Sequence, residues 1–298
     1  MTFPAPWACW ATASRRPRLR EETMSRALRR ADERLAVALV TGACSGIGRA
    51  FAMRLGSLGY ELVLVSNRPT ELAATAQAIS AAHGVVTHTI VSDLARPEAA
   101  QDVVREVSGR GLCVDILICN AGCFFFGEAV DADPERAKAM LGLHVVSPSL
   151  LCAGFGRQMR ERGRGHILIV SSISAWRDFP GVSYYGASKK YLRGFARALR
   201  SELGVYGVGV TCLAPGPTAT NLFDATTVPV DRARRLGIMM EPSAVAESGL
   251  RALFAGRAEH IPGLLAPLMA WLSMLLPQWV VDCVRRRAPW LPKRGAAA

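Results

Sequence analysis

The sequence has few aromatic residues, 7% of 298, and no element in which they alternate with lysine and arginine to form a basic stripe. Its formal net charge is nevertheless +12. Much of that charge lies at the ends, because residues 1–35 carry eight arginines against four acidic residues and residues 282–298 carry five basic residues against one aspartate. Nucleic-acid binding needs a continuous basic surface, so we do not expect nucleic acid as a partner.

A second pair of metal-binding residues is missing near Cys119 and Cys123, which are four positions apart. A structural zinc site uses two such pairs, so we expect no metal. Most of the eight cysteines lie inside apolar runs, where a reduced cysteine packs as a small hydrophobic residue. This usage favours a reducing compartment, and we expect a cytoplasmic protein.

The N-terminal residues lack the charged-then-apolar order of a secretory signal. Arginine and serine are frequent there, as in organelle-targeting segments, but four acidic residues between positions 21 and 33 argue against that interpretation. We interpret residues 1–34 as a disordered basic leader. The alternative is that translation starts naturally at Met24 and that residues 1–23 come from an upstream start codon.

From residue 35 onward, short apolar runs alternate with segments of helical period, without an internal repeat. Such runs are typical of strands buried on both faces. We predict strands at 35–42, 61–66, 85–92, 114–122, 165–172 and 208–216, and helices at 47–58, 70–82, 97–107, 135–161 and 184–204. This order predicts an α/β fold with a single doubly wound, Rossmann-like parallel sheet and helices on both faces, over residues 35–260. Ligands of such sheets bind beyond the carboxyl ends of the strands.

The first predicted strand runs into a glycine-rich loop with the sequence TGACSGIGRA. Gly42, Gly46 and Gly48 allow the tight turn and the close backbone approach that a pyrophosphate needs at the start of a helix. Together with Ser45 and Ile47 they form the predicted phosphate site for a dinucleotide. A tight turn that only packs the helix against the sheet is the alternative.

The second predicted strand ends without an acidic residue. NAD-dependent enzymes usually have a carboxylate here to hold the ribose 2′-hydroxyl, whereas this sequence has Ser66, Asn67 and Arg68. No carboxylate repels a 2′-phosphate, and Arg68 is able to pair with one. We therefore expect NADP(H) in preference to NAD(H), held in part by Asn67 and Arg68. A solvated loop charge is the alternative for Arg68.

The next two strand ends carry further candidates for cofactor binding. Asp93, followed by Leu94, is placed to accept a hydrogen bond from an adenine amino group, and an N-cap of the following helix is the alternative. The fourth strand ends in Asn120, Ala121 and Gly122. A residue larger than glycine there would intrude on the cofactor.

The stretch SYYGASKKY contains two adjacent tyrosines and two adjacent lysines, which helical spacing distinguishes. Only Tyr185 and Lys189 are four residues apart, so only this pair shares a helix face. A cation beside a phenol lowers the phenol pKa from its usual value of about 10, which suits proton transfer near neutral pH. We expect Tyr184 to line the pocket and Lys190 to face outward.

These motifs resemble those of the short-chain dehydrogenase/reductase family. The resemblance rests on TGACSGIG, CNAG, Ser172, YGASK and PGPTAT, which occur in the family's order and at its spacing over residues 35–256. It implies an oxidoreductase in which hydride moves between a nicotinamide and a carbonyl carbon.

The resemblance also implies a role for each matching residue. Tyr185 would be the general acid that protonates the carbonyl oxygen. Lys189 would hold the ribose hydroxyls and lower the pKa of Tyr185, and Ser172 would orient the substrate oxygen. The residues implied to lie along the nicotinamide are Pro215, Gly216 and Thr218.

The sequence departs from the family pattern in the long helix after the fourth strand. The family has an asparagine there that helps to hold a water between the lysine and solvent, whereas MLGLHVVSPS places His144 at that position. A histidine also donates and accepts hydrogen bonds, so His144 is a candidate catalytic residue, either in an altered relay or as a proton donor. A helix residue without a chemical role is the alternative.

Residues 261–281 contain no charged residue and are long enough, by count, to span a bilayer. Pro262, Pro267 and Pro277 divide them into pieces of about ten residues or fewer, which argues against a spanning helix. We interpret the C-terminal extension, residues 261–298, in two ways. Either it lies on an anionic membrane surface with its three tryptophans near the headgroups, or it forms a substrate lid or an oligomer contact.

Together these features predict NADP(H)-dependent interconversion of a ketone and a secondary alcohol on a lipophilic substrate. Candidates are a 3-oxoacyl thioester, a steroid-like ketone, or another lipid or polyketide carbonyl, and residues 220–240 are expected to form the lid that selects among them. The family resemblance further implies a homo-oligomer. A non-catalytic nucleotide sensor or scaffold of the same fold is the alternative, and a membrane-tethered enzyme is a third interpretation.

Overall fold

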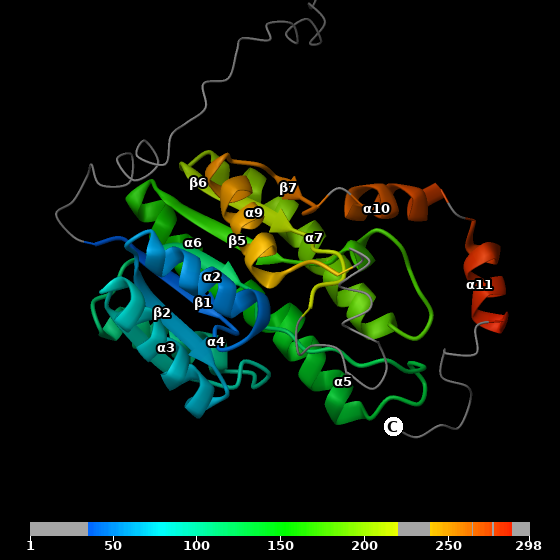
Figure 1. The fold of residues 1–298 in the computed structure, drawn as a ribbon, viewed down its shortest axis with the longest axis horizontal. Helices are drawn as coiled ribbons and strands as arrows, with labels where there is room; N and C mark the ends of the chain where they lie inside the picture. Colours follow the sequence, from blue (N-terminus) through cyan, green and yellow to red (C-terminus); the bar gives the residue numbers. More distant parts are fainter. Residues whose placement is uncertain (1–34, 220–238, 264, 276, 288–298) are drawn as a thin grey trace, which may run out of the picture. The chain divides into compact units, whose positions relative to one another are not determined.

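Parallel strands form one sheet at the centre of the protein (Figure 1). The computed structural model describes residues 35–219, 239–263, 265–275 and 277–287, all of which belong to the unit Leu35–Ala298. The strands in these residues are β1 (Val37–Thr41), β2 (Glu61–Ser66), β3 (Thr87–Val91), β4 (Val114–Cys119), β5 (Gly165–Val170), β6 (Val208–Leu213) and β7 (Glu259–His260). They lie in the order β3-β2-β1-β4-β5-β6-β7, with every neighbouring pair parallel.

Each central strand is apolar at successive positions because it faces a hydrophobic core on both sides. In β1, Leu39 belongs to one buried cluster, while its neighbours Ala38 and Val40 belong to another. Side chains alternate across a strand, so a continuous apolar run is what a doubly covered sheet requires. The six strands predicted from such runs are confirmed: β2 has the predicted bounds, and the other five are somewhat shorter than predicted. β7 was not predicted.

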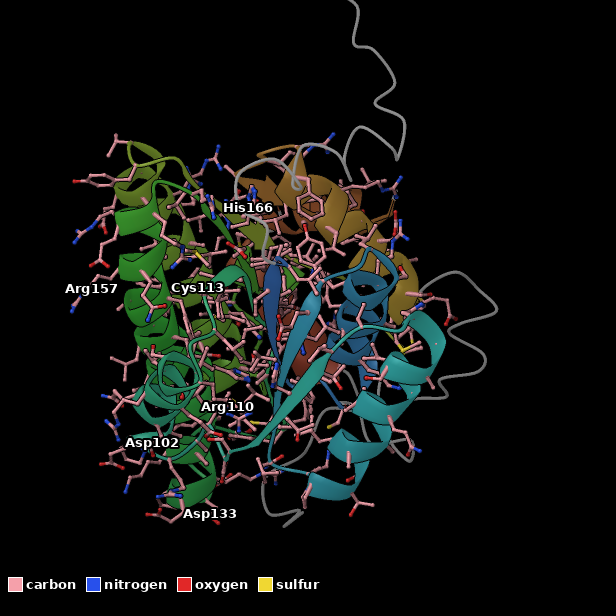
Figure 2. The ribbon with its side chains drawn as sticks, turned by 90° about the vertical axis from the view of Figure 1, so that its left-hand side faces the viewer. Asp102, Arg110, Cys113, Asp133, Arg157 and His166 are labelled. Carbon is pink, nitrogen blue, oxygen red and sulfur yellow. The ribbon has the colours of Figure 1, made fainter. Side chains whose placement is uncertain are left out.

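Helices cover both faces of the sheet (Figure 2). One face is covered by α2 (Gly46–Ser57), α3 (Pro69–His83) and α9 (Pro242–Phe254), and the other by α4 (Ala99–Gly109), α6 (Ser147–Arg162) and α7 (Ser183–Gly204). In Figure 2 the second group lies to the left of the sheet, where Asp102 of α4 and Arg157 of α6 are labelled. The predicted doubly wound α/β architecture is confirmed.

The long helix after β4 is interrupted by a π turn. It comprises α5 (Pro134–Leu141), the π turn η1 (Gly142–Val146) and α6. Pro134 occupies the first turn of α5 behind the N-cap Asp133, whose side chain accepts a hydrogen bond from Glu135 N. Among the described residues, this helical stretch alone is long and apolar enough to cross a bilayer by length and composition, and 44% of its apolar window is buried inside the protein.

The C-terminal extension contains two short helices, α10 (Leu265–Leu275) and α11 (Gln278–Arg287). The apolar run is therefore broken before Pro277, as its prolines predict. Pro267, in contrast, does not break a helix: it lies in the first turn of α10, where a backbone N–H has no intrahelical partner to lose. Of the predicted lid 220–240, residues 220–238 lie outside the described residues.

Candidate active site

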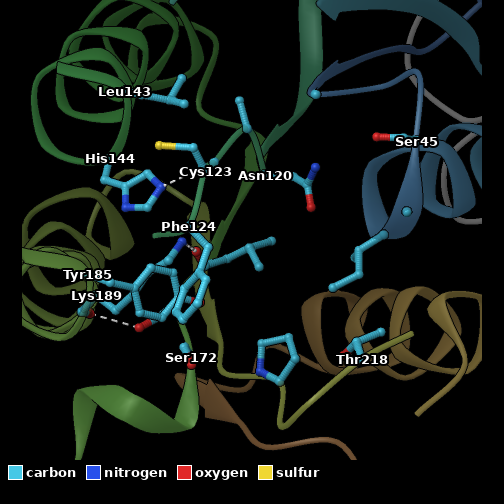
Figure 3. Close-up of a pocket in the computed structure, with 18 of the residues that line it drawn as sticks. Ser45, Asn120, Cys123, Phe124, Leu143, His144, Ser172, Tyr185, Lys189 and Thr218 are labelled. Carbon is cyan, nitrogen blue, oxygen red and sulfur yellow. Dashed lines mark hydrogen bonds between the residues drawn. The ribbon is translucent and has the colours of Figure 1, made fainter. Parts of the chain in front are cut away.

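A cavity of about 510 Å³ opens at the carboxyl ends of the central strands (Figure 3). Every residue predicted for the site lines it except Gly48 and Tyr184. These residues are Gly42, Ser45, Gly46, Ile47, Asn67, Arg68, Asp93, Leu94, Asn120, Ala121, Gly122, His144, Ser172, Tyr185, Lys189, Pro215, Gly216 and Thr218. Residues up to 176 positions apart in the sequence thus meet at one sheet edge, where a doubly wound fold places its ligands.

The glycines of the glycine-rich loop have two different roles, one in backbone conformation and one in packing. Gly42 and Gly46 have φ values of +65° and +52°, in the left-handed region that favours glycine. Gly48 instead packs α2 against the loop, because a Cβ there would lie 2.1 Å from Gly42 O and 2.5 Å from Asn120 Nδ2. Gly42 and Gly46 therefore form the tight turn and line the cavity, whereas Gly48 packs behind it.

At the end of β2, the guanidinium of Arg68 turns toward the glycine-rich loop. Its Nη2 donates to Ser45 Oγ at 2.6 Å and to Cys44 Sγ at 3.0 Å. The Ser45 hydroxyl makes no capping hydrogen bond to α2. The Ser66 Oγ atom lies 3.0 Å from Cys44 Sγ. One cation and three small polar side chains thus gather at the cavity wall, beside the N-terminus of α2.

Hydrogen bonds between side chains and backbone N–H groups hold the neighbouring strand ends in place. Thr41 Oγ1 accepts hydrogen bonds from the backbone N–H groups of Asn120 at 2.9 Å and Ala121 at 3.0 Å, which join the ends of β1 and β4. Asp93 accepts a hydrogen bond from Ala95 N at 3.1 Å. The alternative N-cap role of Asp93 is wrong, because the N-cap of α4 is Glu98.

In α7, the two adjacent tyrosines lie in different surroundings, and so do the two adjacent lysines. Lys189 is buried and its Nζ donates to Val170 O at 3.1 Å, while Tyr185 lines the cavity with its ring centroid 5.6 Å from that Nζ. Lys190 pairs with Asp178 at 2.9 Å on the surface, so its outward orientation is confirmed. Tyr184 packs near Phe125, with 6.1 Å between ring centroids, and is not among the residues lining the cavity. Its predicted place in the pocket is therefore wrong.

Burial dominates the electrostatics of this pair. It raises the pKa of Tyr185, which a hydrogen bond with Ser172 opposes and the neighbouring Cys123 reinforces. Burial also lowers the pKa of Lys189 to about 8. The predicted lowering of the Tyr185 pKa is therefore wrong for the protein alone, because burial disfavours the phenolate more than the hydrogen bond with Ser172 favours it.

His144 lies in the π turn with 1% of its surface exposed. Its Nε2 accepts a hydrogen bond from Cys123 N at 2.9 Å, and its Nδ1 lies 2.9 Å from Ser188 Oγ. Its ring stands edge-on to Tyr185, with 5.8 Å between centroids. Burial, and then the charge of Lys189, lower its pKa well below 6.5. His144 is thus close to the predicted catalytic residues, although both of its ring nitrogens have protein partners.

The family model described as short chain dehydrogenase matches residues 36–229 of this chain. The chain belongs to the short-chain dehydrogenase family. An uncharacterized oxidoreductase of Myxococcus xanthus is 30% identical over 251 residues, 84% of this chain and 96% of the relative. The cattle protein named dehydrogenase/reductase SDR family member 7B is 34% identical over 224 residues, 74% of this chain and 68% of the relative.

Solved structures of short-chain dehydrogenases share the fold. A short-chain dehydrogenase from Sphingobium yanoikuyae in complex with NADPH is 26% identical, with a TM-score of 0.72 over 89% of this chain and 99% of its own. A 7beta-hydroxysteroid dehydrogenase is 25% identical, with a TM-score of 0.74 over 82% and 93%. The resemblance expected from the sequence motifs is confirmed at the level of family and fold.

Beyond the residues expected in a short-chain dehydrogenase, the cavity has an apolar wall that sequence reasoning missed. Phe124 contributes most clearly, with its ring 5.0 Å from that of Tyr185 and nearly perpendicular to it. Cys123, Leu143, Ile173 and Val182 also line the cavity. The run of three phenylalanines that begins two residues after CNAG was the available sequence signal, because the apolar run follows directly on the end of a strand that faces the cavity.

Proposed function

We propose that this short-chain dehydrogenase uses NADP(H) to interconvert a ketone and a secondary alcohol on a lipophilic substrate. The observation that carries the proposal is the shared cavity of Ser172, Tyr185, Lys189 and the glycine-rich loop. A nucleotide site alone would suit a sensor. A nucleotide site that shares its cavity with a serine, a buried lysine and a phenol suits proton and hydride transfer.

The residues around the predicted nucleotide site fit NADP(H). The free first turn of α2 offers N–H groups to a pyrophosphate, since Ser45 does not cap it. Arg68, held 2.6 Å from Ser45 Oγ, offers a cation for a 2′-phosphate. The NADPH bound to the Sphingobium relative supports this choice. NAD(H) lacks the 2′-phosphate and would leave Arg68 without that partner.

In the reductive direction, Tyr185 would donate its phenolic proton to the substrate oxygen while Ser172 holds that oxygen by a hydrogen bond. A bound NADPH would supply the hydride. A raised phenol pKa keeps Tyr185 protonated at neutral pH, as a proton donor requires. Lys189, whose pKa of about 8 leaves it mostly charged at pH 7, would hold the ribose and stabilise the phenolate that remains.

The apolar wall favours a lipophilic substrate. Phe124 stands over Tyr185, so an alkyl or ring system attached to the carbonyl carbon would contact the phenylalanine ring rather than water. The solved hydroxysteroid dehydrogenase of the same fold supports a substrate of this class. A non-catalytic sensor remains the alternative function. It is less well supported, because such a protein has no need for Ser172, Tyr185 and Lys189 in one cavity.

The C-terminal helices carry an exposed apolar stripe, which is consistent with an enzyme that takes a lipophilic substrate. Leu268, Leu272 and Leu275 recur at helical spacing on α10, followed by Trp279 on α11, and are 50%, 48%, 61% and 69% exposed. The opposite side of α10 is buried through Ala266 and Ala270. We propose that this leucine stripe contacts an anionic lipid surface, since basic residues follow it in α11. The side chains of the other two tryptophans lie outside the described residues.

Turnover of a panel of ketones and alcohols with NADPH, NADH and their oxidised forms tests the reaction. Tyr185→Phe should abolish carbonyl reduction and leave NADPH affinity within about twofold, because the phenol contributes its proton to the reaction. Tyr184→Phe is the matched control, since Tyr184 lies outside the cavity lining, and should retain activity. Retained turnover by Tyr185→Phe contradicts the mechanism.

Arg68→Ala tests the cofactor. Loss of a charge-assisted hydrogen bond of about 1.5–3 kcal/mol should weaken NADPH binding by roughly ten- to hundredfold and leave NADH binding nearly unchanged. Arg105→Ala, an exposed partner of Asp102 on α4, removes the same charge far from the cavity lining and should affect neither. Equal losses for the two cofactors would contradict the assignment.

A further inference from the structure

His144 joins two parts of the site that are distant in the sequence. Its Nε2 accepts from the backbone N–H of Cys123, in the loop after β4. Its Nδ1 faces Ser188 Oγ at 2.9 Å, and the same hydroxyl donates to Tyr185 O at 2.8 Å. One continuous chain of hydrogen bonds therefore runs from the β4 loop, through the imidazole and the serine hydroxyl, to the backbone of Tyr185.

The directions of these hydrogen bonds determine the tautomer of His144. A backbone N–H only donates, so Nε2 must carry the lone pair. The single proton of the Ser188 hydroxyl goes to Tyr185 O, so Ser188 Oγ must accept from an Nδ1–H group. The ring is therefore neutral and protonated on Nδ1, with both nitrogens engaged. No position on the ring remains for a substrate proton or a relay water.

The space around the ring fits this arrangement. Gly122 lies directly beside it, and a Cβ at that position would be only 3.0 Å from His144 Nε2. The charged and titratable groups that face His144 are Lys189 and Tyr185, and the backbone N–H of Cys123 donates to its Nε2. A second proton on the imidazole would face the Cys123 N–H and the lysine charge, so the neutral form is stabilised from both sides.

We propose that His144 is a positioning residue: as an Nδ1–H imidazole it fixes the catalytic turn of α7 to the loop that carries Cys123 and Phe124. This inference rests on the proposed function of Tyr185 as proton donor. The distance between Tyr185 and the apolar wall is then set by two hydrogen bonds at His144 in addition to packing. A displacement of the order of 1 Å at a reacting group is enough to cost roughly a hundredfold in rate.

Nuclear magnetic resonance of the histidine nitrogens in the intact protein tests the arrangement without any substrate. The signals that disappear in His144→Asn belong to His144, and those that disappear in His83→Asn, an exposed residue at the end of α3, provide the reference. The expected result is a proton on Nδ1 only, with no titration between pH 8 and 6. A proton on Nε2, or protonation near pH 6.5, would overturn the proposal.

Kinetics of four variants test the consequence. His144→Leu and Ser188→Ala each interrupt the chain, and each should lower kcat by roughly ten- to hundredfold with KM for NADPH within about twofold. Because both act on the same chain, the double variant should lose no more than the worse single variant. His144→Asn, which keeps one donor and one acceptor, should recover part of kcat with an unchanged pH profile.

The kinetic outcomes separate the alternatives. Multiplying losses in the double variant, full activity in His144→Leu, or the disappearance of an ionisation from the pH profile in His144→Asn would each contradict a positioning role. If the wild-type protein reduces no carbonyl in the panel, the proposed function fails. The tautomer measurement then still decides whether His144 links Cys123 to Ser188.

Discussion

Replacement of His144 by asparagine should make the protein more resistant to acid. In the folded state, burial and the charge of Lys189 hold the pKa of His144 well below 6.5. In the unfolded chain the same imidazole has its ordinary pKa of about 6.5. Below that pH the unfolded state binds a proton that the folded state does not, so the free energy of unfolding falls as the pH falls. Asparagine removes this difference.

The size of the His144 effect on the free energy of unfolding follows from the pH range. Each pH unit below 6.5 costs about 1.4 kcal/mol for one histidine that stays neutral in the folded protein. Between pH 8 and pH 5 the His144 contribution to this loss is therefore about 2 kcal/mol. His166 and His260 also have lowered pKa values, chiefly through burial, and add the same pH dependence to both proteins. The difference between wild type and variant isolates His144.

Urea denaturation of both proteins at pH 8, 7, 6 and 5 measures the effect. We expect His144→Asn to be less stable at pH 8, because it loses part of the buried network, and to lose about 2 kcal/mol less on going to pH 5. His83→Asn, which removes an exposed histidine, serves as the control. Identical pH dependence in wild type and His144→Asn would show that the pKa of His144 is the same in the folded and unfolded states, which would refute the reasoning.

Three further predictions concern other parts of the molecule. Gly48→Ala should lower the free energy of unfolding by at least about 1–3 kcal/mol in urea denaturation, because its Cβ would overlap Gly42 O; unchanged stability would contradict this packing. NADPH affinity, measured by titration calorimetry, should weaken between pH 7 and 9 as Lys189, with a pKa of about 8, loses its charge, and Lys189→Met should show no such trend. Leu272→Glu should reduce sedimentation with anionic vesicles, whereas Val205→Glu, at an exposed position outside the leucine stripe, should not; equal binding by both variants would argue against a lipid contact.

Much of the fold could be predicted because its central strands are buried on both faces. Such strands have continuous apolar runs, for example ELVLVS in β2, and these runs can be recognised without knowing which distant residues pack against them. β7 escaped prediction because it has two residues and pairs only with the end of β6, at Cys212 and Leu213. Two residues are too few for any periodicity to appear.

The candidate site likewise has features that the sequence could predict and features that it could not. The pairing of Tyr185 with Lys189 depends only on helical spacing, so the sequence was sufficient to select both from their doublets. The phenol pKa depends on how much water the folded cavity excludes, and the sequence predicted its direction wrongly. The hydrogen bonds of His144 join residues 21 and 44 positions away, and no local pattern encodes such contacts.

The π turn at Gly142–Val146 limits how the length of this chain can vary. A π turn holds one residue more than an α turn, and each residue of a helix advances the direction of its side chains by about 100°. Deletion of one residue here would allow regular α-helix and would rotate all of α5 by about that angle. Ala137 and Met140, now buried, would turn toward solvent. Single-residue deletions should therefore be far less tolerated in this turn than in the exposed loop before α5.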